Sequence, residues 1–180
     1  GQAWRVEATP WANGVQGVAG GSPDTTIVDT APTAPVVSLP LTASTTEDIS
    51  ASIDTDSTDA DGDVVSYSIE WLRDGEAVPA WADMPVLPAD ATAKGAVWRV
   101  QVTPVADGVS GPAATSGGIT IIDTPPTSPT VAIVQTARTG EDVTVTFAVD
   151  STDVDGDDIT YTVAWLRDGV VMPAYTDDIL

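Results

Sequence analysis

The sequence has 180 residues and contains neither cysteine nor histidine. Without cysteine it can form no disulfide and no thiolate metal site, and without histidine it has no Ser-His or Cys-His nucleophile and no histidine zinc site. Positive charge is also scarce, because six Lys and Arg stand against 27 Asp and Glu, for a net charge of −21. This balance argues against nucleic acids and anionic membranes as partners and favours cations.

Long apolar runs are missing too. No stretch approaches the roughly 20 apolar residues that span a bilayer, so no membrane insertion is expected in this segment. The first residues look like a strand and not like a signal peptide, so we expect any export signal or anchor to lie outside this sequence. Hydrophobic residues make up 42% of the chain, which is enough for packed cores. The acidity then has two interpretations, a self-repelling soluble surface or a specific cation-binding role.

The chain repeats itself at an offset of 94 residues. The segment GQAWRV at 1–6 returns as GAVWRV at 95–100, and DSTDADGD at 56–63 returns as DSTDVDGD at 150–157. A period of this length is typical of an autonomous domain, since solenoid units of roughly 20–50 residues cannot bury their own core. An array of such domains predicts a structural or adhesive role.

Apolar and polar residues alternate with a period of two in several short runs, which predicts strands at 49–53, 65–71, 98–102 and 119–122, and at 143–147 and 159–165 in the next copy. About seven strands per repeat, with a Trp on the third, favour an all-β fold of tandem immunoglobulin-like β-sandwich repeats. We expect four repeated tryptophans to pack in the cores: Trp4, Trp71, Trp98 and Trp165.

Proline-rich segments at 29–35 and 123–129 are the expected linkers. They divide the chain into the last strands of one repeat (1–30), a complete repeat (31–124) and the first strands of a further repeat (125–180). Residues 125–180 together with 1–30 nearly make a whole domain, lacking only the counterpart of 87–94. Either the sequence is a window of a longer polymer, or chains complement each other head to tail by strand donation.

The loop at 56–63 places aspartates at alternating positions around a Gly. Oxygen ligands in this spacing suit calcium, which takes 6 to 8 of them, although the loop matches only part of an EF-hand. The alternative is an Asp-rich turn whose side chains accept hydrogen bonds from its own backbone. Sandwich topology predicts Asp107 near Asp59, Asp61 and Asp63, and predicts Glu47 and Asp48 near the next linker and loop. The candidate calcium ligands are Asp56, Asp59, Asp61, Asp63, Asp107, Asp123, Asp150, Asp153, Asp155 and Asp157.

These residues carry a family resemblance. The run 56–71 resembles the strand-turn-strand of bacterial and archaeal cell-surface repeats of the PKD and other immunoglobulin-like types, and 26–32 is similar to the closing strand and linker of cadherin-like domains. The resemblance implies an extracellular or cell-surface stalk, adhesin or filament protein, often stiffened by calcium. The chain departs from cadherins in lacking their Asn-bearing linker motif.

We therefore expect a structural repeat of a secreted or cell-surface filament, stalk or adhesin, not an enzyme, with neighbouring repeats or head-to-tail copies as partners. The alternative is a module that binds a glycan or a surface protein through Trp11, Trp81 and Tyr175, which lie in loop-like contexts. Partial packing at the sandwich edge would also explain these aromatics. Paired carboxylates formally permit glycoside hydrolysis, but here they recur with the fold and imply no substrate cleft.

Overall fold

The computed structural model describes residues 1–174, and nearly all of the regular secondary structure in them is β-strand. Within these residues the helical segments are two 3-10 turns, η1 (Pro79–Trp81) and η2 (Ala89–Ala91). No helix in this range is long and apolar enough to cross a membrane. The predicted all-β, sandwich-like character is confirmed at this level.

Contacts group the chain into two compact units, each assembled from three segments. Unit 1 contains 1–39, 50–85 and 99–118, and unit 2 contains 40–49, 86–98 and 119–180. Two strands cross the division, β9 (Ile49–Ser50) and β14 (Val97–Ala106). Both expected linkers lie inside a unit, 29–35 in unit 1 and 123–129 in unit 2.

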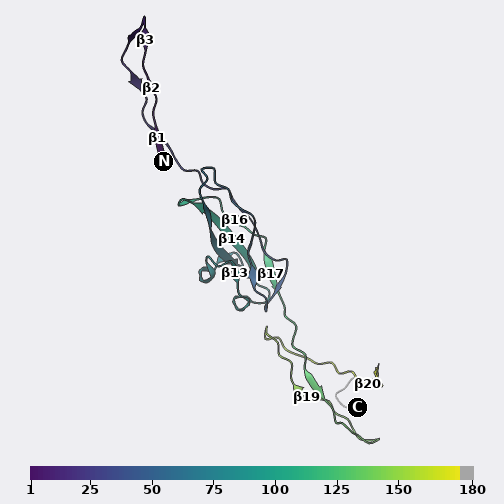
Figure 1. Cartoon of the computed structure of the whole chain (residues 1–180). Coiled ribbons are helices and arrows are strands. Elements are labelled where there is room, and N and C mark those ends of the chain that lie inside the picture. The colour runs from purple at the N-terminus through teal and green to yellow at the C-terminus, as the bar shows by residue number, and fades with distance from the viewer. Residues whose placement is uncertain (175–180) are drawn as a thin grey trace. The chain divides into compact units, whose positions relative to one another are not determined.

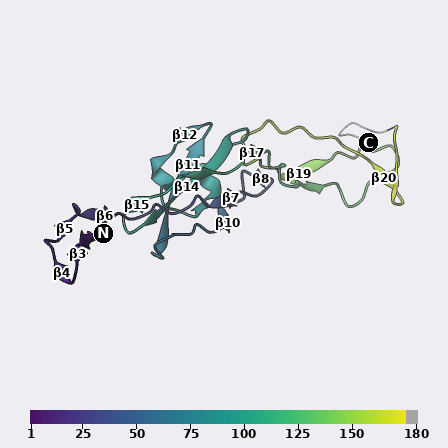
Figure 2. The ribbon, with the colours of Figure 1, turned by 90° about the horizontal axis from the view of Figure 1, so that it is seen from above.

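Unit 1 contains the N-terminal hairpins and most of the long strands. Its other strands are β1 (Gln2–Trp4), β2 (Glu7–Ala8), β3 (Trp11–Ala12), β4 (Val15–Gln16), β5 (Gly20–Gly21), β6 (Thr25–Ile27), β7 (Val36–Ser38), β10 (Ser52–Thr55), β11 (Val65–Arg73), β12 (Glu76–Ala77), β15 (Val109–Ser110) and β16 (Ala114–Thr115). Antiparallel pairs join β1 to β6, β2 to β5, β3 to β4, β7 to β10 and β11 to β12. Strand β14 lies between β11 on one side and β15 and β16 on the other (Figures 1 and 2).

The core of unit 1 follows from the alternation along β14. Val100, Val102, Pro104 and Ala106 are buried, and the residues between them are partly exposed. This period of two places one face of the strand against the core. Trp71 on β11 is fully buried, and its Nε1–H donates a hydrogen bond to the Met84 carbonyl at 2.9 Å.

Unit 2 contains the shorter strands β8 (Ala43–Ser44), β13 (Val86–Leu87), β17 (Ile119–Ile122), β18 (Thr130–Ala132), β19 (Thr146–Val149), β20 (Leu166–Arg167) and β21 (Val170–Val171). Strand β17 pairs in parallel with β8 and antiparallel with Val97 and Trp98, while β18 pairs with β19 and β20 with β21. Its buried apolar residues are Ala43, Ile49, Leu87, Ala96, Trp98, Ile119, Ile121 and Trp165.

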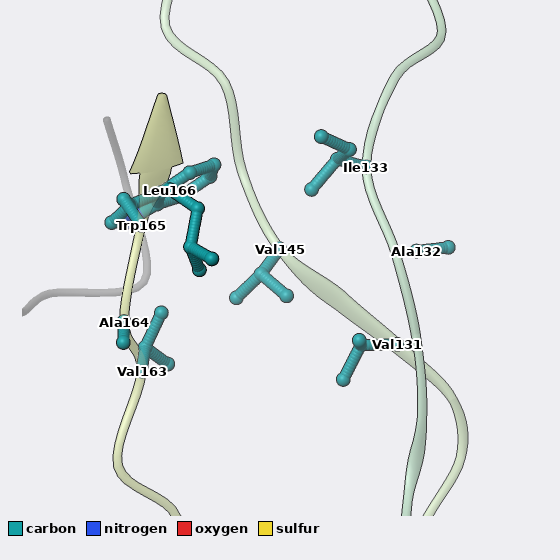
Figure 3. A pocket seen from close by; sticks show the side chains of 8 residues that line it. All are labelled: Val131, Ala132, Ile133, Val145, Val163, Ala164, Trp165 and Leu166. Carbon is teal, nitrogen blue, oxygen red and sulfur yellow. The ribbon is translucent and has the colours of Figure 1, made fainter. Parts of the chain in front are cut away.

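Two expectations about the terminal copies are wrong. Residues 159–165 have the alternation of a strand but form no strand in the described structure, and Figure 3 shows the last three of them, Val163 to Trp165, on the trace that leads into β20. Trp4 is 62% exposed instead of buried, whereas Trp71, Trp98 and Trp165 do lie in cores. In both cases the local sequence matches the central copy, but the strand pairing or burial of the central copy is not found at these residues in the described structure.

Candidate functional site: the acidic loop and the linker

Hydrogen bonds between an aspartate side chain and backbone N–H groups of the same loop stabilise the conformation of the acidic loop at 56–63. One carboxylate oxygen of Asp59, Oδ1, accepts hydrogen bonds from the N–H groups of Asp61 at 2.9 Å and Asp63 at 3.2 Å. Gly62 lies at φ +83°, a conformation that glycine adopts without steric cost. The N–H of Ser57 donates to the Tyr67 hydroxyl at 2.8 Å, which ties the loop to β11. The loop therefore contains the self-capping turn that was one of the two interpretations.

The same loop holds the linker of unit 1. The Thr30 N–H donates to Asp61 Oδ2 at 2.7 Å, and the Thr33 N–H donates to the Thr58 carbonyl at 2.9 Å. In return, the Thr58 N–H donates to Thr33 Oγ1 at 2.8 Å. Pro32, between these contacts, is buried. The linker is thus fixed to the loop at several points and is not a free connection.

Three carboxylates meet beside these contacts. Oxygens of Asp29, Asp63 and Asp107 all lie within 4.8 Å of one another, so they could hold a metal ion. Asp107 reaches this position from the tight turn between β14 and β15, where its φ is +42°. Two carboxylate oxygens in this region, Asp29 Oδ2 and Asp59 Oδ2, are shielded from solvent, and no hydrogen-bond donor among the described residues reaches them.

The pKa values of Asp29 and Asp61 are shifted in opposite directions. Desolvation, a hydrogen bond with Asp61 and the negative charge of Asp63 raise the pKa of Asp29 above its ordinary value. The Thr30 N–H, which donates to the Asp61 carboxylate, lowers the pKa of Asp61. Asp29 therefore takes up a proton more readily than Asp61, and a proton on Asp29 can be donated to Asp61.

A second loop and linker in unit 2 have the same contacts at positions 94 residues further on. The Thr124 N–H donates to Asp155 Oδ2 at 2.8 Å, and Asp153 Oδ1 accepts from the N–H groups of Asp155 and Asp157 at 2.9 and 3.1 Å. A hydrogen bond with Asp155, together with desolvation, raises the pKa of Asp123, while the Thr124 N–H lowers that of Asp155. Loop and linker thus associate in the same way in both units.

The loop and linker of unit 2 differ from those of unit 1 in having a lysine, Lys94, among their carboxylates. Its Nζ donates to Asp157 Oδ1 at 2.6 Å and lies 3.5 Å from a carboxylate oxygen of Asp123, and the bond to Asp157 raises the pKa of the ammonium. Thr45 also joins this site through a hydroxyl hydrogen bond to Thr124 at 2.8 Å. An ammonium group therefore already neutralises part of the charge on this linker and loop.

The predicted ligands are only partly brought together. Asp63 and Asp107 do meet, but Asp56 faces the Tyr67 hydroxyl at 3.4 Å, and Asp150 is an exposed residue at the start of the second loop. Glu47 accepts a hydrogen bond from the Ser44 N–H and Asp48 accepts one from the Ala89 N–H, at 2.8 Å in both cases, while Thr45 of the same segment contacts the second linker at Thr124.

The sequence reasoning missed three participants, Asp29, Thr45 and Lys94. Asp29 could have been found, since it is the counterpart of Asp123 one repeat earlier. Lys94 and Thr45 are far from the second loop in the chain, so no local motif indicates their role.

The three aromatic candidates have different surroundings. Trp11 is exposed on β3 and lines a hollow of about 320 Å³ together with Pro10, Val15 and Gln16. Trp81 is half-buried at the end of η1. Tyr175 lies outside the described residues.

Comparison with models of known protein families gives no match, and comparison with curated proteins gives none at a significant level.

Proposed function

We propose that this chain is a structural segment of a secreted or cell-surface filament, stalk or adhesin, made of tandem immunoglobulin-like repeats. The observation that carries the proposal is the fixation of each proline-containing linker by an acidic loop, with Thr30 bound to Asp61 and Thr124 bound to Asp155. Linkers that are held at several points transmit orientation along an array, whereas free linkers act as flexible joints.

We further propose that calcium stiffens the linker in unit 1. The oxygens of Asp29, Asp63 and Asp107 are close enough to bind one ion together, and oxygen ligands are those that calcium prefers. After desolvation and the hydrogen bond with Asp61, repulsion from Asp63 also raises the pKa of Asp29, and a bound divalent cation would offset that repulsion. In unit 2 the Lys94 ammonium supplies part of the same neutralisation, so we expect weaker calcium binding there.

No catalytic activity is part of this proposal. Asp59 and Asp153 accept hydrogen bonds from N–H groups of their own loops, and Asp61 and Asp155 accept them from the linkers, which is a structural use of carboxylates.

Calorimetric calcium titration and thermal melts in EDTA and in millimolar calcium test the proposal. Binding to the folded state alone stabilises it by about 2.7 kcal/mol at 100 times the dissociation constant, so melting should shift upward. Asp63→Asn should abolish most of this shift. Asp24→Asn removes one charge from an exposed position outside the cluster and serves as the matched control. Equal melting curves with and without calcium at constant ionic strength would contradict the role of calcium.

A separate measurement tests stiffness. Small-angle scattering should show a narrower distribution of dimensions for the wild type than for Asp61→Ala, because the substitution removes the acceptor of the Thr30 N–H. If the two proteins scatter alike, the loop does not hold the linker in solution.

A further inference from the structure

The linker at 29–35 packs on unit 1 through two of its prolines. Pro32 and Pro35 are buried, whereas the residues directly beside each of them are exposed. Prolines three residues apart fall on the same side of a chain that has the three-residue turn favoured by proline. This spacing gives the linker one apolar side, and that side is covered by the rest of the unit.

A glycine lies against the backbone of this linker. Gly111 is located between β15 and β16, and a Cβ atom added to it would overlap the carbonyl oxygen of Pro32. The same Cβ would lie 3.0 Å from the carbonyl carbon of Pro32 and 3.0 Å from Cγ of Pro104. Only a residue without a side chain allows the two backbones to approach this closely.

The hairpin side of this contact is fixed within the unit. The Gly111 N–H donates a hydrogen bond to the Pro104 carbonyl at 2.9 Å, and the Pro104 ring is fully buried. Pro104 belongs to β14, whose alternate residues form the core. Gly111 and Pro104 together are called the glycine seat below. The glycine seat cannot move away from the linker without disturbing a core strand.

The linker side of the contact is also fixed. Pro32 is fully buried, and the residues that flank it bind the acidic loop. The Thr30 N–H donates to Asp61 Oδ2 at 2.7 Å, and the Thr33 N–H donates to the Thr58 carbonyl at 2.9 Å. A displacement of Pro32 away from Gly111 would therefore strain hydrogen bonds on both sides of the proline.

We propose that the glycine seat is a positioning device that holds the linker in place without a cation. The inference rests on the proposed function, in which fixed linkers make the array stiff. Gly111 and Pro32 carry no charge, so their contact does not depend on calcium. The glycine seat and the acidic loop hold the same linker by different means, and calcium adds to an attachment that already exists.

Gly111 has an alternative role, in which its small size serves only its own hairpin, because Cγ of Pro104 is close as well. The two contacts differ in how they could be relieved. A proline ring can change its pucker and move Cγ by a few tenths of an ångström, whereas the Pro32 carbonyl belongs to a backbone that is held on both sides. The overlap with Pro32 is also the closer of the two. The linker is therefore the part that a side chain at 111 would displace.

Amide hydrogen exchange measured by NMR in EDTA tests the inference on the full chain. In Gly111→Ala the Thr30 and Thr33 amides should exchange about tenfold faster than in the wild type, as expected when an overpacked contact opens a local structure. Gly117→Ala is the matched control, because an added Cβ there meets no atom within 4 Å. It should leave both amides unchanged.

Two other amides report on the hairpin itself. The Val100 N–H donates to Ser116 Oγ at 3.0 Å, and the Ser116 N–H donates to the Val100 carbonyl at 2.9 Å. Both should keep their wild-type protection in Gly111→Ala. If they lose protection as strongly as Thr30 and Thr33, glycine is required by the hairpin and the inference is wrong.

A variant of the linker keeps the test decisive if Gly111→Ala unfolds. Pro32→Ala removes the buried ring and should also accelerate exchange at Thr30 and Thr33, whereas Pro40→Ala, at an exposed proline, should not. In a double variant, Gly111→Ala should add little to the effect of Pro32→Ala on these amides, because both act on one contact. Independent, additive effects would overturn the inference.

The outcomes separate this inference from the proposed function. Protected Thr30 and Thr33 amides that are equally protected in Gly111→Ala, or in Pro32→Ala, would refute the glycine seat and leave the attachment of the linker through Asp61 intact. Wild-type amides that are unprotected in EDTA would refute the glycine seat together with the proposal of a linker that is fixed in the absence of metal.

Discussion

Trp98 and Trp4 form a natural pair for measuring what burial contributes in this protein. They occupy the same place in the repeat and begin the same kind of antiparallel pairing, but Trp98 is 1% exposed and Trp4 is 62% exposed. The residue opposite Trp98 is the buried Ile119, whereas the residue opposite Trp4 is the exposed Thr25. Replacing each by Ala therefore makes one chemical change in two environments.

The expected effects differ by several kcal/mol. Trp98→Ala removes a large buried side chain and leaves a cavity, which typically costs about 3–5 kcal/mol of unfolding free energy. Trp4→Ala changes a mostly solvated side chain and should alter stability by no more than about 0.5 kcal/mol. With a urea m value of about 1–3 kcal/mol per molar, the midpoint for Trp98→Ala should fall by more than about 1 M.

Urea unfolding followed by far-ultraviolet circular dichroism measures both variants. Similar midpoint shifts for the two variants, or a loss below about 1 kcal/mol for Trp98→Ala, would refute the view that β14 supplies the core and that residues 1–28 are uncovered.

Three further predictions concern the loops. In metal-free buffer, stability should rise as the pH falls from neutral toward the ordinary aspartate pKa of 3.8, because the raised pKa of Asp29 means that the folded state binds that proton more tightly. Below that value stability should fall, because the lowered pKa values of Asp61 and Asp155 make their protonation unfavourable for the folded state. Asp29→Asn should reduce the rise in urea midpoint but not remove it, because the pKa of Asp123 is raised as well, and a steady decline in the wild type would contradict the assignment. Lys94→Met should increase calcium binding in unit 2 by calorimetry, with Arg99→Met as a control for charge alone. Tyr67→Phe should cost about 1 kcal/mol in urea, because the Ser57 N–H loses its acceptor, and an unchanged midpoint would show that water replaces the hydroxyl.

Local sequence was sufficient to predict much of the fold. Alternation of apolar and polar residues follows from the period of a strand, so β11 and the buried face of β14 could be recognised without a structure. The acidic loop was equally accessible, because aspartates that cap their own turn lie within a few residues of each other, as Asp59 does with Asp61.

Only the tertiary structure determines which strands pair, which side chains are covered and which charged groups meet. Residues 159–165 and 65–71 have the same pattern, but a strand requires hydrogen bonds from a neighbour, and only the second has one in the described structure. Trp4 and Trp98 likewise share their local sequence and differ in what covers them. Lys94 reaches the carboxylate of Asp157 from 63 positions earlier in the chain. Local sequence determines which conformation a segment favours, whereas burial and ion pairing depend on residues that only folding brings together.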